Sequence, residues 1–407
     1  MKILVVSQQY WPENWRIVDV CEELVLRGHH VSVVCGLPND AQGKLLPNYR
    51  DKSFYSEQHN GVSIYRVADH PRKKGDLNLF KKYMTFVNHA NKLLKTFPDD
   101  FDVIFSNQLS PVMQTMPALK FGKRIGKPVL MYCYDLWPES LGVRGVVNHG
   151  ITKPIYHHYL RLSRKIYNSV NQILVTSPDY LNYLHETCLV PLDRMKYVPQ
   201  YAEDIFATKA QPKLTHSTSH NFVFAGNVGS AQDVETLLTA GRRLLPYPDI
   251  SIHILGSGSD LEKCQRMAEK DKLTNVLFHG SLPLSEMPGA YEAADALLVV
   301  LSRFSFLNYV VPGKVQSYME YGKPIIAACN GATPRMIEEA HCGVSVPSGD
   351  AEGLATALLT LAAMNPEQKF QMGASARAYS DAHFSREQFF RILEDELQSL
   401  SNHTSTK

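Results

Sequence analysis

The first half of the chain alternates between short apolar runs and stretches with helical spacing. Residues 2–7 and 31–35 are strand-like, and residues 16–27 between them have a helical repeat that ends at Gly28. Further strand-like runs lie at 62–67, 103–106, 129–133 and 173–176. Because strand, helix and strand follow one another in this order, the pattern predicts a parallel, doubly wound α/β sheet.

A second alternation begins after a polar segment at 207–220. Its strand-like runs lie at 221–226, 250–258, 275–280, 296–301, 324–328 and 342–346. Closing helices are predicted at 353–362 and 386–400, the latter amphipathic, and a disordered tail at 401–407. We therefore predict three parts: a Rossmann-like N-terminal domain over 1–200, a Rossmann-like C-terminal domain over 201–385, and a final helix over 386–400.

Composition agrees with a globular protein of two domains. Of 407 residues, 44% are hydrophobic and 20% charged, and no apolar run approaches the ~18 residues that span a bilayer. The start MKILVVSQQYW lacks the features of a signal peptide, and the seven cysteines are scattered without metal-site spacing. We expect reduced, buried thiols and a cytoplasmic location. Nothing indicates a nucleic-acid partner, and the sequence does not predict an oligomeric state.

The two halves differ in charge. Residues 1–200 carry 25 basic against 17 acidic side chains, whereas residues 201–407 carry 17 against 23. Two basic stretches, at 70–84 and 156–167, interleave Lys, Arg and His with aromatic and aliphatic residues. This composition suits helices on an anionic membrane surface, although an amphipathic helix with its charged face in water has the same pattern.

Glycines and basic residues follow successive strands of the second domain. The residues concerned are Gly226, Asn227, Gly229, Gly256, Gly258, Arg303, Val311, Pro312, Gly313 and Lys314. Ligands of open α/β sheets bind beyond the carboxyl ends of strands, and a helix that begins at Gly313 would favour a phosphate there. One such loop alone could be an ordinary turn. Their repetition predicts a nucleotide-diphosphate site, without a GxGxxG or Walker A sequence.

Two segments of the first domain also carry candidate chemistry. The loop at 8–19 contains Glu13, Asn14 and Arg16 between two tryptophans, and it could bind a substrate or pack on a partner. The segment YDLWPES places Asp135 and Glu139 directly after the strand at 129–133. Carboxylates at such a position could serve as a general base or position a sugar hydroxyl, or could cap the next helix.

Taken together, several motifs resemble glycosyltransferases of the GT-B fold, family 4. They are the start of the chain, SPVMQTMPALK, YDLWPES, FAGNVG, HGSLP and PGKVQSYMEYGKPII. Bacterial O-antigen and capsule transferases of the fucosaminyltransferase type are most similar. The resemblance implies retaining transfer from a UDP-sugar bound by the C-terminal domain to an acceptor bound mainly by the N-terminal domain. It also implies an active site in the interdomain cleft and a final helix that crosses back to the first domain.

This chain departs from the family pattern at several positions. Many members carry two glutamates eight positions apart, where this chain has Tyr309 and Ser317. Many members also carry a pair of basic residues after the first strand of the C-terminal domain; here these positions hold Asn227, which follows Gly226, and Gln232. A histidine of some members corresponds to Tyr134. Lys314, Arg303 and the backbone of 311–313 are therefore expected to hold more of the diphosphate.

The resulting expectation is a glycosyltransferase on the inner face of the plasma membrane. It would move a sugar, an N-acetylated or deoxy hexose, from a UDP-sugar to a polyprenyl-diphosphate-linked acceptor in surface polysaccharide or O-antigen biosynthesis. Leu282 and Met287 would line the base pocket, and Asp135 would act on the acceptor hydroxyl. No metal or other cofactor is expected. The alternatives are a hydrolysing UDP-sugar 2-epimerase and a non-enzymatic sugar-nucleotide-binding scaffold.

Overall fold

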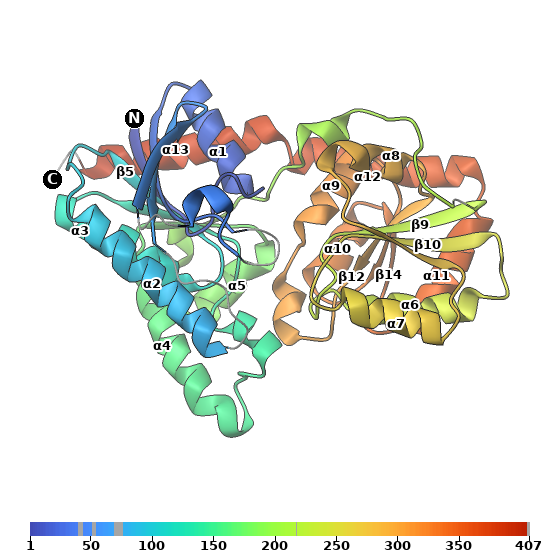
Figure 1. Cartoon of the computed structure of the whole chain (residues 1–407). Helices are drawn as coiled ribbons and strands as arrows, with labels where there is room; N and C mark the ends of the chain where they lie inside the picture. The colour runs from blue at the N-terminus through green and yellow to red at the C-terminus, as the bar shows by residue number, and fades with distance from the viewer. Residues whose placement is uncertain (40–43, 51–53, 69–75, 217, 405–407) are drawn as a thin grey trace. The chain divides into compact units, whose positions relative to one another are not determined.

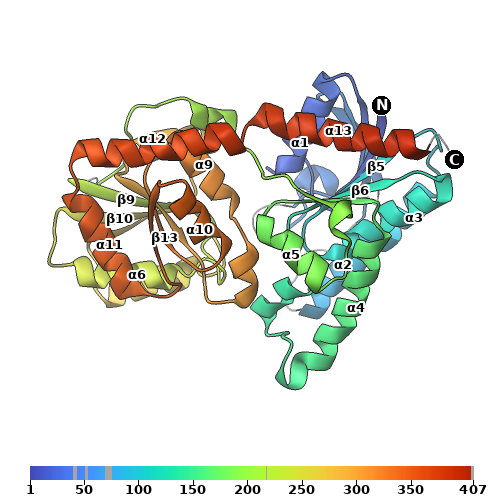
Figure 2. The same cartoon turned by 180° about the vertical axis from the view of Figure 1, so that it is seen from behind.

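The computed structural model divides the chain into two compact units, shown in Figures 1 and 2. Unit 1 comprises Met1–Val198 and Phe390–Lys407, and unit 2 comprises Pro199–Phe389. The structure describes residues 1–39, 44–50, 54–68, 76–216 and 218–404. Residues 70–75 of the first basic stretch therefore lie outside the described residues.

Unit 1 contains an eight-stranded sheet in the order β3-β4-β2-β1-β5-β6-β7-β8. The strands are β1 Lys2–Val6, β2 His30–Gly36, β3 Phe54–His59, β4 Val62–Val67, β5 Val103–Gln108, β6 Val129–Cys133, β7 Gln172–Val175 and β8 Met195–Tyr197. Neighbouring strands are parallel except for the antiparallel pair β3 and β4. The sequence did not predict β3, which is rich in polar residues, or β8, which has only three residues.

Helices cover the unit 1 sheet. They are α1 Arg16–Leu26, α2 Asp76–Leu94, α3 Met116–Ile125, α4 Lys153–Ser169, α5 Pro178–Glu186 and α13 Arg386–Thr404. Short 3-10 helices are η1 Pro47–Tyr49, η2 Val112–Thr115, η3 Glu139–Arg144, η4 Gly150–Thr152 and η5 Leu192–Arg194. In α1, the buried side chains Ile17, Val20, Cys21 and Leu24 have the spacing of one helical face.

In Figure 2, the last helix, α13, crosses in front of α1. Arg27 pairs with Glu394 at 3.1 Å, and its guanidinium lies 5.0 Å from the ring centroid of Phe390. Because the helix continues to Thr404, the predicted disorder of residues 401–404 is wrong, and residues 405–407 lie outside the described part of the chain.

Unit 2 contains a six-stranded, fully parallel sheet in the order β11-β10-β9-β12-β13-β14. Its strands are β9 His220–Ala225, β10 Ile250–Leu255, β11 Val276–Gly280, β12 Ala296–Val300, β13 Ile325–Ala328 and β14 Gly343–Val346. One apolar core joins the sheet to α6 Val234–Leu244, α7 Leu261–Lys270 and α11 Ala351–Ala363. A second core lies on the other face, against α8 Met287–Glu292, α9 Gly313–Tyr321, α10 Ala332–Glu339 and α12 Pro366–His383 (Figure 1). The 3-10 helices are η6 Asp204–Ala207, η7 Leu284–Glu286 and η8 Ser305–Tyr309.

Both sheets reverse their strand order at one point. In unit 1, the chain leaves β1 for β2 on one side and later returns to β5 on the other; in unit 2, the same happens at β9 and β12. The predicted fold class, two Rossmann-like doubly wound α/β domains, is confirmed. Ligands of such sheets bind beyond the carboxyl ends of the strands at the reversal, which directs attention to the loops after β1, β5, β9 and β12.

Candidate active site

Lys314 is the second residue of α9, and its amine is buried against the loop after β9. A Cβ atom on Gly226 would lie 2.7 Å from Lys314 Nζ, and Nζ lies 4.0 Å from the ring centroid of Phe224. Among the described residues, Nζ has no hydrogen-bond partner. Burial lowers the pKa of Lys314 to about 7. The side chain is therefore a buried amine that an anion would convert to its charged form.

The start of α9 adds main-chain donors beside this amine. Pro312 precedes the helix in an extended conformation, and Gly313 and Lys314 begin the first turn. The first amides of a helix have no carbonyl one turn earlier to bind, and the helix dipole favours negative charge there. The Lys314 amine and this helix start thus place several hydrogen-bond donors beside the loop after β9, an arrangement suited to an anion.

The glycine loops after β9 and β10 pack directly on each other. A Cβ atom on Gly256 would lie 1.7 Å from the Gly226 carbonyl oxygen, and one on Gly258 would lie 2.2 Å from the Val228 carbonyl oxygen. The Val228 amide donates to the Ser257 carbonyl at 2.8 Å. Contact between the loops thus explains Gly256 and Gly258, whereas Gly226 makes room for the lysine.

Asn227 and Gln232 occupy the positions of the basic pair found in many relatives. Asn227 Nδ2 donates to Gln232 Oε1 at 3.1 Å, and a Cβ atom on Gly229 would lie 2.7 Å from Asn227 Nδ2. The three residues form one local arrangement in the loop after β9. They contribute neutral polar groups to the site and no charge.

Arg303 follows β12 and is held by the loop after β14. Its Nε donates to the Ser348 carbonyl at 3.0 Å, and its Nη2 donates to the Gly349 carbonyl at 3.2 Å. Burial raises the pKa of Asp233, and the charge of Arg303 opposes part of that rise. Arg303 thus packs on the loop after β14, whereas the Lys314 amine packs on the loop after β9.

Ser317 lies one turn after Gly313 in α9 and contacts a carboxylate. Its Oγ donates to Glu203 Oε2 at 3.0 Å. Sequence reasoning missed Glu203, because the residue precedes η6, outside the strand ends, and is 114 positions from Ser317. The other position where many relatives carry a glutamate, Tyr309, ends η8.

Leu282 and Met287 lie beyond β11, where the base pocket was predicted. Both are partly buried and pack against the core on the α8 and α9 face of the sheet. Val311, just before α9, is buried in the same core. Leu282 and Met287 are therefore the partly exposed apolar side chains of this group.

In unit 1, packing accounts for part of the aromatic loop between β1 and α1. Glu13 Oε1 accepts from the Asn39 amide at 2.8 Å, and Glu13 Oε2 accepts from Trp15 Nε1 at 2.9 Å. Trp11 stacks on His59 with ring centroids 4.1 Å apart. Both carboxylate oxygens of Glu13 are thus engaged in holding the loop together.

The end of that loop holds two further predicted site residues. Asn14 is exposed, and Arg16 begins α1. Burial raises the pKa of Tyr134, and the charge of Arg16 opposes part of that rise.

The two predicted carboxylates have different surroundings. Burial raises the pKa of Asp135 to about 6, although hydrogen bonds to its carboxylate act against that rise. Glu139 Oε1 accepts hydrogen bonds from the hydroxyls of Tyr156 in α4 and Tyr183 in α5, the latter at 2.8 Å. Glu139 thus ties this segment to two helices, whereas Asp135 has a pKa suited to proton transfer near neutral pH.

Buried amides beside the β5 end were missed in the sequence. Asn107 and Gln108 end β5, and Gln114 lies in η2; all three are at most 1% exposed. Three of their atoms lack a hydrogen-bond partner among the described residues: Asn107 Oδ1, Gln108 Oε1 and Gln114 Nε2. The same is true of the Tyr134 hydroxyl. In the sequence, the polar pair Asn107-Gln108 at the end of a strand-like run could have marked these residues as site candidates.

Two features are absent from the described residues: a cluster of metal-ligating side chains and a helix able to cross a membrane. No group of three or more His, Cys, Asp or Glu side chains there is arranged to hold a metal ion. The sequence Asp100-Phe101-Asp102 has the Asp-x-Asp spacing, but it precedes β5 at the amino edge of the sheet, where both carboxylates bind Lys2. No helix among these residues has the length and apolar character needed to cross a membrane. All seven cysteines are buried and unpaired.

Comparison with known proteins identifies both parts of the chain. Residues 14–200 match the family described as "Glycosyltransferase Family 4", and residues 219–364 match "Glycosyl transferases group 1". No curated protein matches the sequence.

Solved structures of similar fold cover nearly the whole chain. A sucrose-phosphate synthase from Thermosynechococcus elongatus has a TM-score of 0.75 at 16% identity over 98% of each chain. HepE of Anabaena in complex with UDP and glucose has a TM-score of 0.72 at 14% identity, covering 98% of this chain and 100% of that one. WaaG, a glycosyltransferase involved in lipopolysaccharide biosynthesis, has a TM-score of 0.67 at 14% identity, covering 98% and 99%. This chain is therefore a glycosyltransferase of the GT-B fold, with a family 4 domain followed by a group 1 domain.

Proposed function

We propose that this glycosyltransferase moves a sugar, with retention of configuration, from a UDP-sugar to an acceptor linked to polyprenyl diphosphate. The proposed setting is surface polysaccharide or O-antigen biosynthesis on the inner face of the plasma membrane. The observation that carries the donor half of the proposal is the Lys314 amine, buried without a partner beside Gly226 and the start of α9. This is the environment that an anionic leaving group would complete.

The donor half follows from charge. When the glycosidic bond to UDP breaks, negative charge grows on the β-phosphate, and preorganised donors that meet this charge lower the barrier. Lys314 is the donor in contact with the β9 loop, and the first amides of α9 lie beside it. Arg303 would contribute its charge from the loop after β12. In this arrangement, the diphosphate is neutralised by protein groups, and we propose that no metal is required.

The acceptor half rests on unit 1. Asp135, with a pKa of about 6, is mostly ionised at pH 7 and would orient or deprotonate the attacking hydroxyl. The unsatisfied amide atoms of Asn107, Gln108 and Gln114 would bind other acceptor hydroxyls, since buried polar atoms normally have partners. Asn14 and Arg16 would help to position the acceptor.

The comparisons support the substrate class only by analogy. The HepE structure is described as a complex with UDP and glucose, and WaaG as involved in lipopolysaccharide biosynthesis. Motifs of the fucosaminyltransferase type in this sequence favour an N-acetylated or deoxy hexose as the transferred sugar. At the two positions where many relatives carry glutamates, we propose that the donor meets Tyr309 and Ser317, the latter bound to Glu203.

Product analysis tests the proposal. The protein is incubated with radiolabelled UDP-sugars and a bacterial membrane extract, and we expect label in the lipid fraction. Lys314→Met should remove that product, while Lys270→Met, on the exposed surface of α7, should not. An epimerised nucleotide sugar formed without acceptor would instead support a 2-epimerase. Binding of the UDP-sugar without any product would support a non-enzymatic scaffold.

A further inference from the structure

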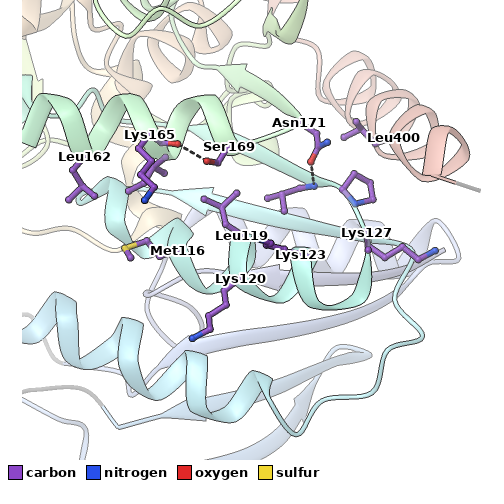
Figure 3. A pocket seen from close by; sticks show the side chains of 15 residues that line it. Met116, Leu119, Lys120, Lys123, Lys127, Leu162, Lys165, Ser169, Asn171 and Leu400 are labelled. Atoms are coloured by element: carbon purple, nitrogen blue, oxygen red, sulfur yellow. Dashed lines mark hydrogen bonds between the residues drawn. The ribbon is translucent and has the colours of Figure 1, made fainter. Parts of the chain in front are cut away.

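A groove of about 870 Å³ in unit 1 is lined by four lysines but does not bring their charges together (Figure 3). Lys120 and Lys127 point away from each other in this view. Residues 126–129, at and before the start of β6, also line the groove, so it lies at the amino edge of the sheet. The groove therefore offers no single place for an anion.

In unit 2, by contrast, a carboxylate is fixed against the helix that carries Lys314. Ser317, three residues after Lys314 in α9, is buried, and its Oγ donates to Glu203 Oε2 at 3.0 Å. Positions three apart are neighbours on the surface of a helix. The helix thus has a cationic side chain in its first turn and, through Ser317, a carboxylate about one turn further along.

The segment that carries Glu203 runs past the start of α9. A Cβ atom on Gly313 would lie 3.7 Å from Gln200 Oε1. Glu203 directly precedes η6, and its carbonyl accepts a hydrogen bond from the Phe206 amide at 2.9 Å. Glu203 is therefore held at its backbone by this turn and at its side chain by Ser317.

The same segment also reaches α8, the helix at which the base pocket is predicted. Phe206 stacks on Tyr291 of α8 with ring centroids 5.1 Å apart. Met287, predicted to line the base pocket, is the first residue of α8. Glu203 thus lies on a segment that joins the predicted base pocket to the helix that carries Lys314.

The part of UDP between the base and the diphosphate is the ribose. An ionised carboxylate only accepts hydrogen bonds and has about four sites for them, so it can hold a serine hydroxyl and a vicinal diol together. A carboxylate this near a diphosphate would repel the ligand unless it also received hydrogen bonds from it. The 2′ and 3′ hydroxyls of ribose can donate such bonds, and bonds to an ionised group are strong.

We infer that Glu203, positioned by Ser317, binds the ribose hydroxyls of the nucleotide and makes unit 2 select ribonucleotides. The inference rests on the proposed function, which puts the diphosphate at Lys314. The two proposals can fail separately, because Lys314 acts on any diphosphate, whereas Glu203 discriminates only between ligands that differ in their ribose hydroxyls.

The test is calorimetric titration of the full chain with UDP and with 2′,3′-dideoxyuridine diphosphate. The ratio of the two Kd values isolates the ribose hydroxyls, since base and diphosphate are the same in both ligands. Wild type should bind UDP about tenfold or more tightly than the analogue, because the analogue lacks hydrogen bonds to a charged group. Glu203→Gln should reduce the ratio to about threefold or less, since its amide can accept from Ser317 but has no charge.

Two control variants should keep the wild-type ratio. Asp204→Asn removes the same charge from the neighbouring residue, whose side chain is 80% exposed. Lys314→Met should weaken binding of both ligands alike, because both contain the diphosphate. A wild-type ratio near one would overturn the inference, as would a wild-type ratio in Glu203→Gln or an equal fall of the ratio in Asp204→Asn.

Ser317→Ala tests the positioning role without a change of charge. The variant keeps the Glu203 carboxylate and removes the hydroxyl that fixes it, so the ratio should fall several-fold. Circular dichroism shows whether each variant is folded. If Glu203→Gln does not fold, the ratio in Ser317→Ala decides, and an unchanged ratio there would overturn the inference.

Discussion

At the scale of single residues, the proposed donor site depends on the Lys314 amine, whose pKa is lowered by burial. Lys314 is in van der Waals reach of Gly226 and over the ring of Phe224, surroundings that offer no counter-charge. A lysine with a pKa of about 7 can be neutral in the empty enzyme and charged in the complex. The neutral amine can therefore lie in apolar surroundings in the empty enzyme, and its charged form can neutralise a leaving diphosphate.

Asp135 should set the acid limb of the pH dependence of transfer. Because burial raises its pKa to about 6, a general base at this position loses activity as the pH falls below that value. Asp135→Asn should reduce kcat by about a hundredfold or more and remove the acid limb near pH 6. Initial rates of transfer between pH 5 and 8 measure both effects.

Glu139→Gln is the matched control for this prediction. Its carboxylate binds two tyrosine hydroxyls, so the variant should lower the melting temperature and keep the acid limb. If Asp135→Asn kept the wild-type pH profile, Asp135 would not be the base.

The candidate site could be predicted where local sequence encodes it and not where the fold assembles it. Lys314 stands out because a glycine and a lysine open a helix before a buried strand, and both features are local. Glu203 reaches Ser317 from 114 positions away, and no local pattern marks it. The roles of Gly256 and Gly258 could not be separated from that of Gly226, because only the structure shows which loops touch.

At the scale of elements, the loops after β9 and β10 form one packed unit, and a single Cβ atom should disrupt it. At Gly256, the added atom would lie 1.7 Å from the Gly226 carbonyl oxygen, with φ at +151°. Gly256→Ala should therefore destabilise unit 2 by a few kcal/mol and weaken UDP binding, because the Gly226 loop must move.

Gly280→Ala is the control, since φ there is +67° and no atom lies within 4 Å of the added Cβ. It should cost about 1 kcal/mol and leave UDP affinity unchanged. Thermal unfolding and UDP titration of the two variants check these expectations, and similar behaviour of both would refute the account of loop packing.

A histidine in β10 should make unit 2 sensitive to acid. His253 Nδ1 lies 2.9 Å from His279 Nε2, and burial together with the charges of His279 and His216 lowers the pKa of His253 to about 4. The unfolded chain, with a histidine pKa of ~6.5, takes up this proton first as the pH falls. The contribution of His253 to the free energy of unfolding of unit 2 is therefore fully present above pH ~6.5 and is lost as the pH falls toward 4. Between pH 7 and pH 5 the free energy of unfolding should fall by about 2 kcal/mol.

Amide hydrogen exchange of β10 peptides at these two pH values measures this loss, after correction for the intrinsic pH dependence of exchange. His253→Gln should reduce the difference between them, because glutamine does not titrate. An unchanged difference in the variant would assign the acid sensitivity to another group.

Most elements followed from the apolar pattern, and the exceptions share a physical cause. Strands buried on both faces have continuous apolar runs, which is why β6 and β13 were found. Edge strands such as β3 and β8 have little apolar content or length and depend on a neighbour for their conformation. The C-terminal turn of α13 likewise continues a helix whose stability comes from packing, which composition alone does not reveal.

At the scale of the whole molecule, α13 belongs to both units, since its first residues lie in unit 2 and residues from Phe390 onward in unit 1. Leu393 and Leu397 are completely buried in unit 1. Leu397→Ala should destabilise unit 1 by about 2–5 kcal/mol, the usual cost of such a cavity.

The three tryptophans, Trp11, Trp15 and Trp137, all lie in unit 1, so their fluorescence during denaturation reports this change selectively. Glu396→Gln, next to Leu397 but paired with Lys196 near the surface, should shift the transition by less than about 1 kcal/mol. A Leu397→Ala transition that matched wild type would mean that α13 does not complete the unit 1 core in solution.

The most direct test of the account is calorimetric titration of UDP into wild type, Lys314→Met and the surface control Lys270→Met. Removing the buried amine should weaken UDP binding by about tenfold or more, since a charge-assisted contact is lost, while the control should bind as wild type does. At pH 8, wild type should also take up close to one proton when UDP binds, because the Lys314 amine becomes charged. The measured heat of binding should then depend on the ionisation enthalpy of the buffer. Lys314→Met should show no such proton uptake. Unchanged affinity and proton uptake in Lys314→Met would contradict the account.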